Sequence, residues 1–243
     1  MTIDDAEHIS PEKRKEIIAS YPPHEVEART KGVPVLGSGR IYPVTEESII
    51  VEPFAVPSHW ALIGGLDFGW DHPTAAVELA HDRDTDTVYV GACYQRREAT
   101  PLEHAATLKQ WGQFPWAWPV DAYQRDKRSG GTLRDDYISA GLEMLPEHAT
   151  HPDGGNGVEA GIMEILSRMK TGRFKVFSHL EDWWKEFRLY HRKGGIIVKE
   201  RDDIMDATRY AVMMLRFAES SDVIEGAIDA DPRDSGISSV TGY

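Results

Sequence analysis

The fold is decided by Ala61-Leu62-Ile63-Gly64-Gly65-Leu66-Asp67-Phe68-Gly69, an apolar run that ends in a carboxylate and a glycine. Two further strand-like segments follow at residues 74–80 and 87–94. The polar stretch 82–86 between them, Asp-Arg-Asp-Thr-Asp, is typical of a turn. Together these segments predict a three-strand antiparallel meander.

Beyond the meander, predicted helices and strands alternate along the chain, and a long predicted helix comes last. A short strand is predicted upstream, at residues 49–51. Downstream, strands are predicted at 116–120, 142–145 and 175–177, and helices at 101–110, 132–140, 158–170, 179–190 and 203–217. Thr100 is the expected N-cap of the first helix. This order predicts an α/β fold in which parallel strands extend the meander into a mixed sheet with helices on both faces.

The chain divides into a body and two flanking segments. Residues 1–38 are polar and linker-like, with a short helix expected from Ser10 to about Ser20. The body covers residues 39–218. Residues 219–243 are rich in Ser, Asp and Gly and show little periodicity, so we expect a disordered tail.

Composition excludes several classes of protein. The chain has 243 residues, of which 41% are hydrophobic, so it can bury a sizeable core. Its one cysteine, Cys93, excludes an intrachain disulfide and a cysteine-rich zinc site. No P-loop spacing and no apolar run of about 18 residues occur, so neither an ATP-binding loop of that kind nor a transmembrane helix is expected.

Net charge bears on the binding of nucleic acid. Forty acidic residues against 27 basic ones give a formal net charge of −13, which argues against a protein that coats polyanions generally. A local basic groove remains compatible with this charge. The candidate DNA contacts are basic residues near predicted loops, and a solvated surface is the alternative for each of them. They are Arg125, Lys127, Arg128, Arg192 and Lys193.

Aspartates follow two predicted strands and open the last helix. Asp67 ends the apolar strand, Asp121 follows Trp118-Pro119-Val120, and Asp203 begins the final helix. Sites in open α/β sheets lie at the carboxyl ends of strands. A buried carboxylate needs a partner, and a metal ion is one such partner. Turn or capping roles are the alternatives for these acids.

Two more acids lie beside Asp203. Asp203 and Asp206 are three residues apart and therefore share one helical face, and Asp202 precedes them. Hard cations such as Mg²⁺ take oxygen ligands and keep several waters, so a few carboxylates suffice. Two ions about 3.5–4 Å apart can activate water and stabilise a leaving oxygen of a phosphodiester.

These stretches resemble a known family. The sequence IGGLDFGW at 63–70, WPVD at 118–121 and RDDIMDATRYA at 201–211 together resemble the nuclease domain of the large terminase subunit of tailed bacteriophages. The resemblance runs from about Gly39 to Phe217. It implies a ribonuclease H-like fold and a metal-dependent endonuclease that cuts concatemeric viral DNA during genome packaging, in the cytoplasm of the infected bacterium.

The resemblance also implies roles and partners. Asp67, Asp121 and Asp203 would be the catalytic, metal-binding acids, with Asp202 or Asp206 as further ligands. Mg²⁺ or Mn²⁺, as two ions, would be the cofactor. Double-stranded DNA, a small terminase subunit and the portal protein would be the partners, and no membrane is involved.

Large terminases carry an N-terminal ATPase motor that is missing here. We therefore expect an excised domain, a truncated reading frame or a split gene product, which cuts DNA but does not translocate it. DNA binding is expected to be weak and salt-sensitive because of the net charge.

Two alternatives remain open at this point. One is another ribonuclease H-like enzyme, either a junction resolvase or a sugar-kinase-like phosphotransferase. Asp67-Phe68-Gly69 and the loop around Gly154 suit the phosphotransferase. The other is a non-catalytic packaging or assembly module.

Overall fold

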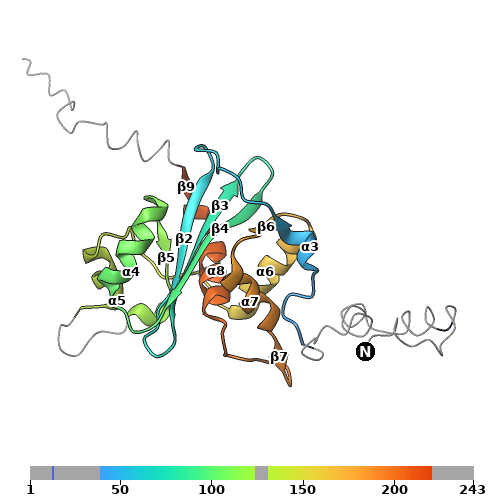
Figure 1. Cartoon of the computed structure of the whole chain (residues 1–243). Helices are drawn as coiled ribbons and strands as arrows, with labels where there is room; N and C mark the ends of the chain where they lie inside the picture. The colour runs from blue at the N-terminus through green and yellow to red at the C-terminus, as the bar shows by residue number, and fades with distance from the viewer. Residues whose placement is uncertain (1–12, 14–38, 124–130, 221–243) are drawn as a thin grey trace, which may run out of the picture.

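The computed structural model describes residue 13 and residues 39–123 and 131–220 (Figure 1). Its centre is a seven-stranded mixed sheet with the order β1-β6-β4-β3-β2-β5, and β9 pairs with β2 beside this path. The strands are β1 (Ile50–Val51), β2 (Ala61–Asp67), β3 (Thr74–Asp82), β4 (Thr87–Arg96), β5 (Trp116–Ala117), β6 (Phe174–Phe177) and β9 (Glu219–Ser220). A separate hairpin joins β7 (Arg192–Lys193) to β8 (Ile196–Ile197).

The predicted meander is confirmed. β2 and β3 pair antiparallel from Ala61↔His81 to Asp67↔Ala75, and β3 pairs antiparallel with β4. Parallel strands extend the meander on both sides, since β5 is parallel to β2 and β6 is parallel to β4 and β1. The expected mixed sheet is therefore present.

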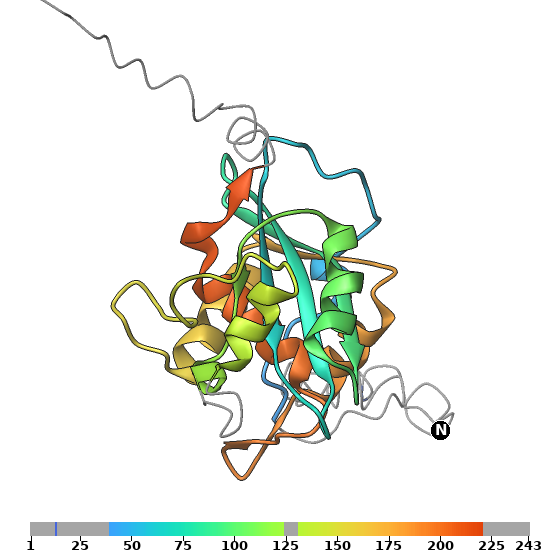
Figure 2. The same ribbon diagram turned by 90° about the vertical axis from the view of Figure 1, so that its left-hand side faces the viewer.

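Helices cover both faces of the sheet, as expected (Figures 1 and 2). On one face α8 (Asp203–Met213) packs against β2 and β3, with α6 (Val158–Lys170) and α7 (Glu181–Leu189) beside it. On the other face α4 (Pro101–Leu108) and α5 (Leu133–Ser139) lie together near β5. The short α3 (Glu46–Ile49) precedes β1. Thr100 caps α4 through a complete capping box.

Two predicted strands are shorter than expected. The strand predicted at 116–120 ends at Ala117, and the 3₁₀ turn Val120–Tyr123 follows. Pro119 cannot donate a hydrogen bond to a neighbouring strand, which explains the early end. The strand predicted at 142–145 is reduced to one bridge between Met144 and Trp116.

The boundaries near the C-terminus also differ. The last helix ends at Met213 and continues as the 3₁₀ turn Leu215–Phe217. Glu219 and Ser220, assigned to the tail from sequence, instead form β9. Of the residues of β2, β5 pairs with Gly64 and Gly65, so the backbone of Ala61 and Leu62 on the same edge is open to β9. The rest of the predicted tail and, apart from Lys13, the segment 1–38 lie outside the described residues.

Two glycines let both layers approach β2 closely. A Cβ on Gly64 would lie 2.2 Å from the ring of Trp116, and a Cβ on Gly65 would lie 2.0 Å from the carbonyl oxygen of Ala207 in α8. Since neither glycine has a Cβ, Trp116 packs on one face of β2 and the backbone of α8 on the other. This contact brings the acidic first turn of α8 to the end of β2. In the described part of the chain, no helix combines the length and apolarity needed to cross a membrane.

Candidate active site

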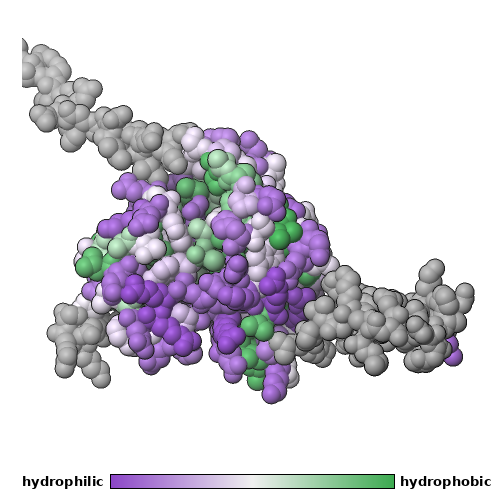
Figure 3. Space-filling model, in the orientation of Figure 1, coloured by the Kyte–Doolittle hydropathy of each residue, from purple (hydrophilic) through white to green (hydrophobic). Residues whose placement is uncertain are grey.

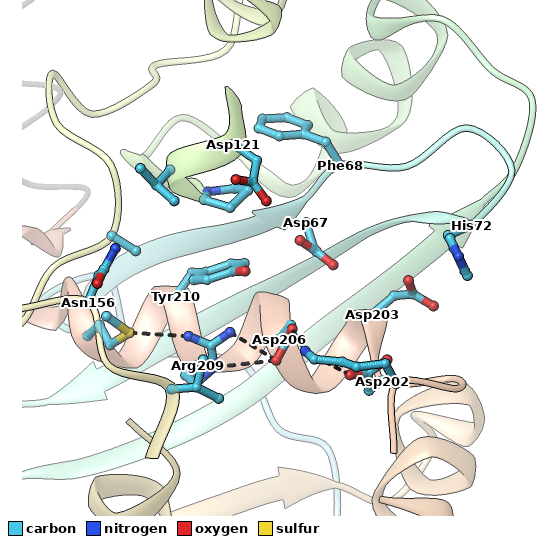
Figure 4. Close-up of a pocket in the computed structure, with 16 residues that line it drawn as sticks. Asp67, Phe68, His72, Asp121, Asn156, Asp202, Asp203, Asp206, Arg209 and Tyr210 are labelled. Atoms are coloured by element: carbon cyan, nitrogen blue, oxygen red, sulfur yellow. Dashed lines mark hydrogen bonds and ion pairs between the residues drawn. The ribbon is translucent and has the colours of Figure 1, made fainter. Parts of the chain in front are cut away.

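A cleft of about 550 Å³ opens at the carboxyl end of β2, between α8 and the 3₁₀ turn Val120–Tyr123. All five predicted acids line this cleft, from Asp67 on β2 to Asp121 on the turn and Asp202, Asp203 and Asp206 around the start of α8. Figure 4 shows Asp67 between Asp121 above it and Asp203 on α8. A band of hydrophilic residues runs across the lower half of the face in Figure 3.

Asp67 is the last residue of β2 and is largely buried. The turn that follows is closed by Thr74, whose hydroxyl accepts from the N–H of Gly69 and donates to its carbonyl. The carboxylate of Asp67 makes no hydrogen bond or ion pair with the residues that the structure describes. Burial, and then the nearby charges of Asp206 and Asp203, raise its pKa well above the usual range. A cation at this point would relieve that excess of negative charge.

Asp203 is half-buried in the first turn of α8, and burial followed by the charge of Asp202 raises its pKa. Neither Asp202 nor Asp203 caps α8 through its side chain. That role falls to Glu186 on α7, whose Oε2 accepts from the N–H groups of Ile204 at 2.7 Å and Met205 at 3.2 Å. Asp202 therefore occupies the N-cap position without a side-chain cap, and Asp203, in the acidic first turn, lines the cleft.

Asp202 and Asp206 are held by cations from within the protein. Lys199 Nζ lies 3.1 Å from Asp202 Oδ2 and 2.7 Å from Asp206 Oδ2. Arg209 Nη2 lies 3.0 Å from Asp206 Oδ1. Burial opposes the charge of Lys199, but the two carboxylates outweigh it and raise the pKa of the amine. These ion pairs fix the two acids beside Asp67 and Asp203.

Asp121 lies on the opposite wall of the cleft and is exposed. Within residues 39–123 and 131–220, no three carboxylate, histidine or cysteine side chains converge closely enough to surround one ion. The structure thus brings Asp67 and Asp203 together as neighbours and places Asp121 across the cleft from them.

Sequence reasoning missed several residues of the cleft. Arg209 and Tyr210 stand in the stretch that carries the family resemblance, three and four residues after Asp206, so helical spacing alone places them near it. Burial, and then the charge of Asp67, raise the pKa of Tyr210. No sequence pattern places Lys199 and His72 near the acids, because both residues lie in loops, where no helical or strand spacing applies.

The candidate DNA contacts are only partly described. Arg125, Lys127 and Arg128 lie outside the described residues. Arg192 forms two hydrogen bonds with Glu159, at 2.7 and 2.5 Å, so its charge is compensated within the protein. Lys193 is exposed in the β7–β8 hairpin.

Two family models match the chain. Residues 64–215 match the model described as the terminase RNaseH-like domain. Residues 1–49 match the model described as the N-terminal part of a T4likevirus-type terminase large subunit.

Individual relatives agree with these matches. The chain is 50% identical over 220 residues to the terminase large subunit of Salmonella phage P22, which is 90% of this chain and 44% of that protein. It therefore spans about half the length of the curated relatives it matches. The solved nuclease domain of the P22 large terminase is 47% identical, with a TM-score of 0.72, and covers 77% of this chain and 98% of that one. The large terminase nuclease of the thermophilic phage G20c, solved with bound cobalt, is 17% identical with a TM-score of 0.50, and the match covers 72% of this chain and 97% of that one.

Proposed function

Since this chain belongs to the terminase family with an RNaseH-like nuclease domain, we propose that it is a metal-dependent endonuclease that cuts concatemeric viral DNA during genome packaging. One observation carries the proposal. The carboxylate of Asp67, which has no hydrogen-bond or ion-pair partner among the described residues, lies beside Asp203 in a cleft whose other wall carries Asp121. The family match also favours a terminase over the resolvase, phosphotransferase and scaffold alternatives.

The side chains present fit Mg²⁺ or Mn²⁺. Both ions take hard oxygen ligands, and Mg²⁺ is commonly bound through one or two carboxylates together with waters and substrate phosphates. Asp67 and Asp203 supply such a pair, and Asp67 is both buried and repelled by neighbouring carboxylates. The bound cobalt of the G20c nuclease supports a divalent ion in this family. We assign two ions to the cleft, held by Asp67 and Asp203, with Asp121 as a ligand from the opposite wall.

When bound, the ions would supply an activated water and stabilise the leaving oxygen of the phosphodiester. The residues of the chain itself hold the charged groups of the cleft in fixed positions. Asp67 and Asp203 stay fixed because β2 and α8 are packed without an intervening side chain at Gly65. Lys199 and Arg209 hold Asp206, and Lys199 also holds Asp202, so these acids organise the cleft.

The wider assignments follow from the family. Double-stranded DNA is the proposed substrate, and a small terminase subunit and the portal protein are the proposed partners. The proposed location is the cytoplasm of an infected bacterium. Arg125, Lys127, Arg128 and Lys193 remain candidate contacts to DNA, whereas the pairing of Arg192 with Glu159 makes it a weaker one.

Metal binding is tested by thermal unfolding with and without Mn²⁺, for wild type and for Asp67→Asn. Without metal, Asp67→Asn is expected to be more stable than wild type, because it removes a buried charge beside two other acids. With Mn²⁺ the order reverses, because a ligand that binds only the folded state raises Tm.

The matched control is Asp84→Asn, which removes an exposed carboxylate in the turn between β3 and β4. It should keep the full Mn²⁺-induced rise in Tm. An equal rise in wild type and Asp67→Asn would contradict a metal site at Asp67.

A further inference from the structure

A second cleft, of about 330 Å³, adjoins the acidic one and shares two of its lining residues, His72 and Asp203. We call it the arginine pocket. Its cations come from three separate elements, at the end of β4, on α7 and just before α8. They are Arg96, Arg97, Lys185 and Arg201.

Two of these cations are already compensated within the protein. Arg96 lies 3.2 Å from Glu103, and Lys185 lies 2.8 Å from Asp182. Arg97 and Arg201 are exposed, and neither makes a hydrogen bond or ion pair with any residue that the structure describes. Two guanidinium groups are thus available to a ligand beside Asp203, in a chain whose net charge is −13.

The backbone of Arg201 adopts an uncommon conformation. Its φ is +56°, a left-handed region that non-glycine residues rarely occupy. Arg201 directly precedes Asp202, the N-cap of α8, so this turn sets the direction in which the chain enters the helix. The same turn places Arg201 in the wall of the arginine pocket and Asp203 between the two clefts. An unfavourable backbone conformation at such a point is common at functional sites.

We propose that Arg97 and Arg201 bind a backbone phosphate of the DNA strand next to the phosphate that is cut. This inference rests on the proposed nuclease function. A guanidinium presents a planar fork of donors that matches phosphate oxygens in a bidentate way. A strand whose scissile phosphate lies at Asp67 and Asp203 brings a neighbouring phosphate past Asp203 into the arginine pocket. Such a contact fixes the position of the strand without reading its sequence.

The test measures how the affinity for a fluorescein-labelled duplex depends on salt, by anisotropy, with Ca²⁺ as the divalent ion. The variants are Arg97→Gln and Arg201→Gly. Glycine adopts a positive φ without strain, so Arg201→Gly removes the guanidinium and preserves the turn. Each variant should lower the slope of log K against log salt, and the two together by about 0.9, the value for one lost phosphate contact. The loss should be the same for duplexes of different sequence, and Arg201→Lys should restore most of the slope.

The control Lys170→Ala removes an exposed cation at the end of α6 that lines neither cleft, and its slope should equal that of wild type. Slopes that stay at the wild-type value in Arg97→Gln and Arg201→Gly would overturn the assignment of the pocket. If Mn²⁺ still raises the Tm of these variants, the proposed function survives that result. A wild-type chain that neither binds the duplex nor responds to Mn²⁺ would overturn both.

Discussion

Replacing Gly65 with alanine tests how the acidic cleft is assembled. The added Cβ would lie 2.0 Å from the carbonyl oxygen of Ala207 and 3.0 Å from the Cβ of Ala211. Ordinary contacts begin near 3.4 Å, so the backbone of α8 has to retreat from β2 by roughly 1.4 Å. The nearer partner is backbone, and the Cβ of Ala211 is fixed directly to the backbone of α8, so no flexible side chain can absorb the clash.

The magnitude follows from this displacement. Overpacking a core costs about 1–3 kcal/mol, and a clash between backbones belongs at the upper end. A loss of about 3 kcal/mol lowers Tm by roughly 6–12 °C in a domain of this size. The retreat also moves Asp203 away from Asp67, and a misplacement of about 1 Å reduces catalysis by roughly 100-fold. Gly65→Ala should therefore lose both stability and Mn²⁺-dependent cleavage.

The assay combines thermal unfolding, urea unfolding and plasmid cleavage for wild type, Gly65→Ala and Gly157→Ala. Gly157 is a matched control, because an added Cβ there meets nothing within 4 Å. Its φ of −62° suits alanine, but Gly157 is the N-cap of α6, where glycine is preferred to alanine, so Gly157→Ala should change stability by less than about 1 kcal/mol and leave cleavage unchanged. An unchanged Tm and unchanged cleavage in Gly65→Ala would refute the close contact between β2 and α8.

Three further predictions concern two supports of the cleft and the cap of α4. Burial raises the pKa of Glu186 from 4.5 to about 8. The protonated side chain therefore contributes stability that is fully present below pH 4.5 and is lost as pH rises through 8. Glu186→Gln should flatten this fall in the free energy of unfolding, measured with urea. Arg209→Met should destabilise the chain by about 3 kcal/mol in the same assay, the lower end for breaking a buried ion pair, because the buried carboxylate of Asp206 loses its guanidinium but keeps Lys199. A change below that of Thr100→Val would contradict this. Thr100→Val, which removes the cap of α4, should cost about 1 kcal/mol by urea unfolding and leave the Mn²⁺ response intact.

Local patterns predicted the elements that build the cleft. Strand-like segments separated by a polar turn were enough to predict β2, β3 and β4, since a hairpin needs only adjacent segments and a turn. The position of Asp67 at the end of an apolar strand and of Asp203 at the start of the last helix likewise predicted that both would lie at one edge of the sheet.

The supports of the cleft depend on contacts that are distant in sequence. Glu186 caps a helix that begins 17 residues later, and no spacing rule connects the two. Lys199 pairs with Asp202 and Asp206 at the start of α8. It does so from a loop whose shape the sequence does not show. β9 forms because β5 leaves one end of β2 unpaired, which depends on the final sheet order. The sequence could identify the acids, but not how their charges are balanced.

Cleavage of supercoiled plasmid tests the central claim most directly. Wild type, Asp67→Asn and Asp84→Asn are compared at low salt with Mg²⁺, with Mn²⁺ and with EDTA. We expect nicked and linear products from wild type and Asp84→Asn with either ion, none with EDTA, and none from Asp67→Asn. Cleavage by Asp67→Asn at the wild-type rate, or cleavage that persists in EDTA, would contradict a metal-dependent nuclease centred on Asp67.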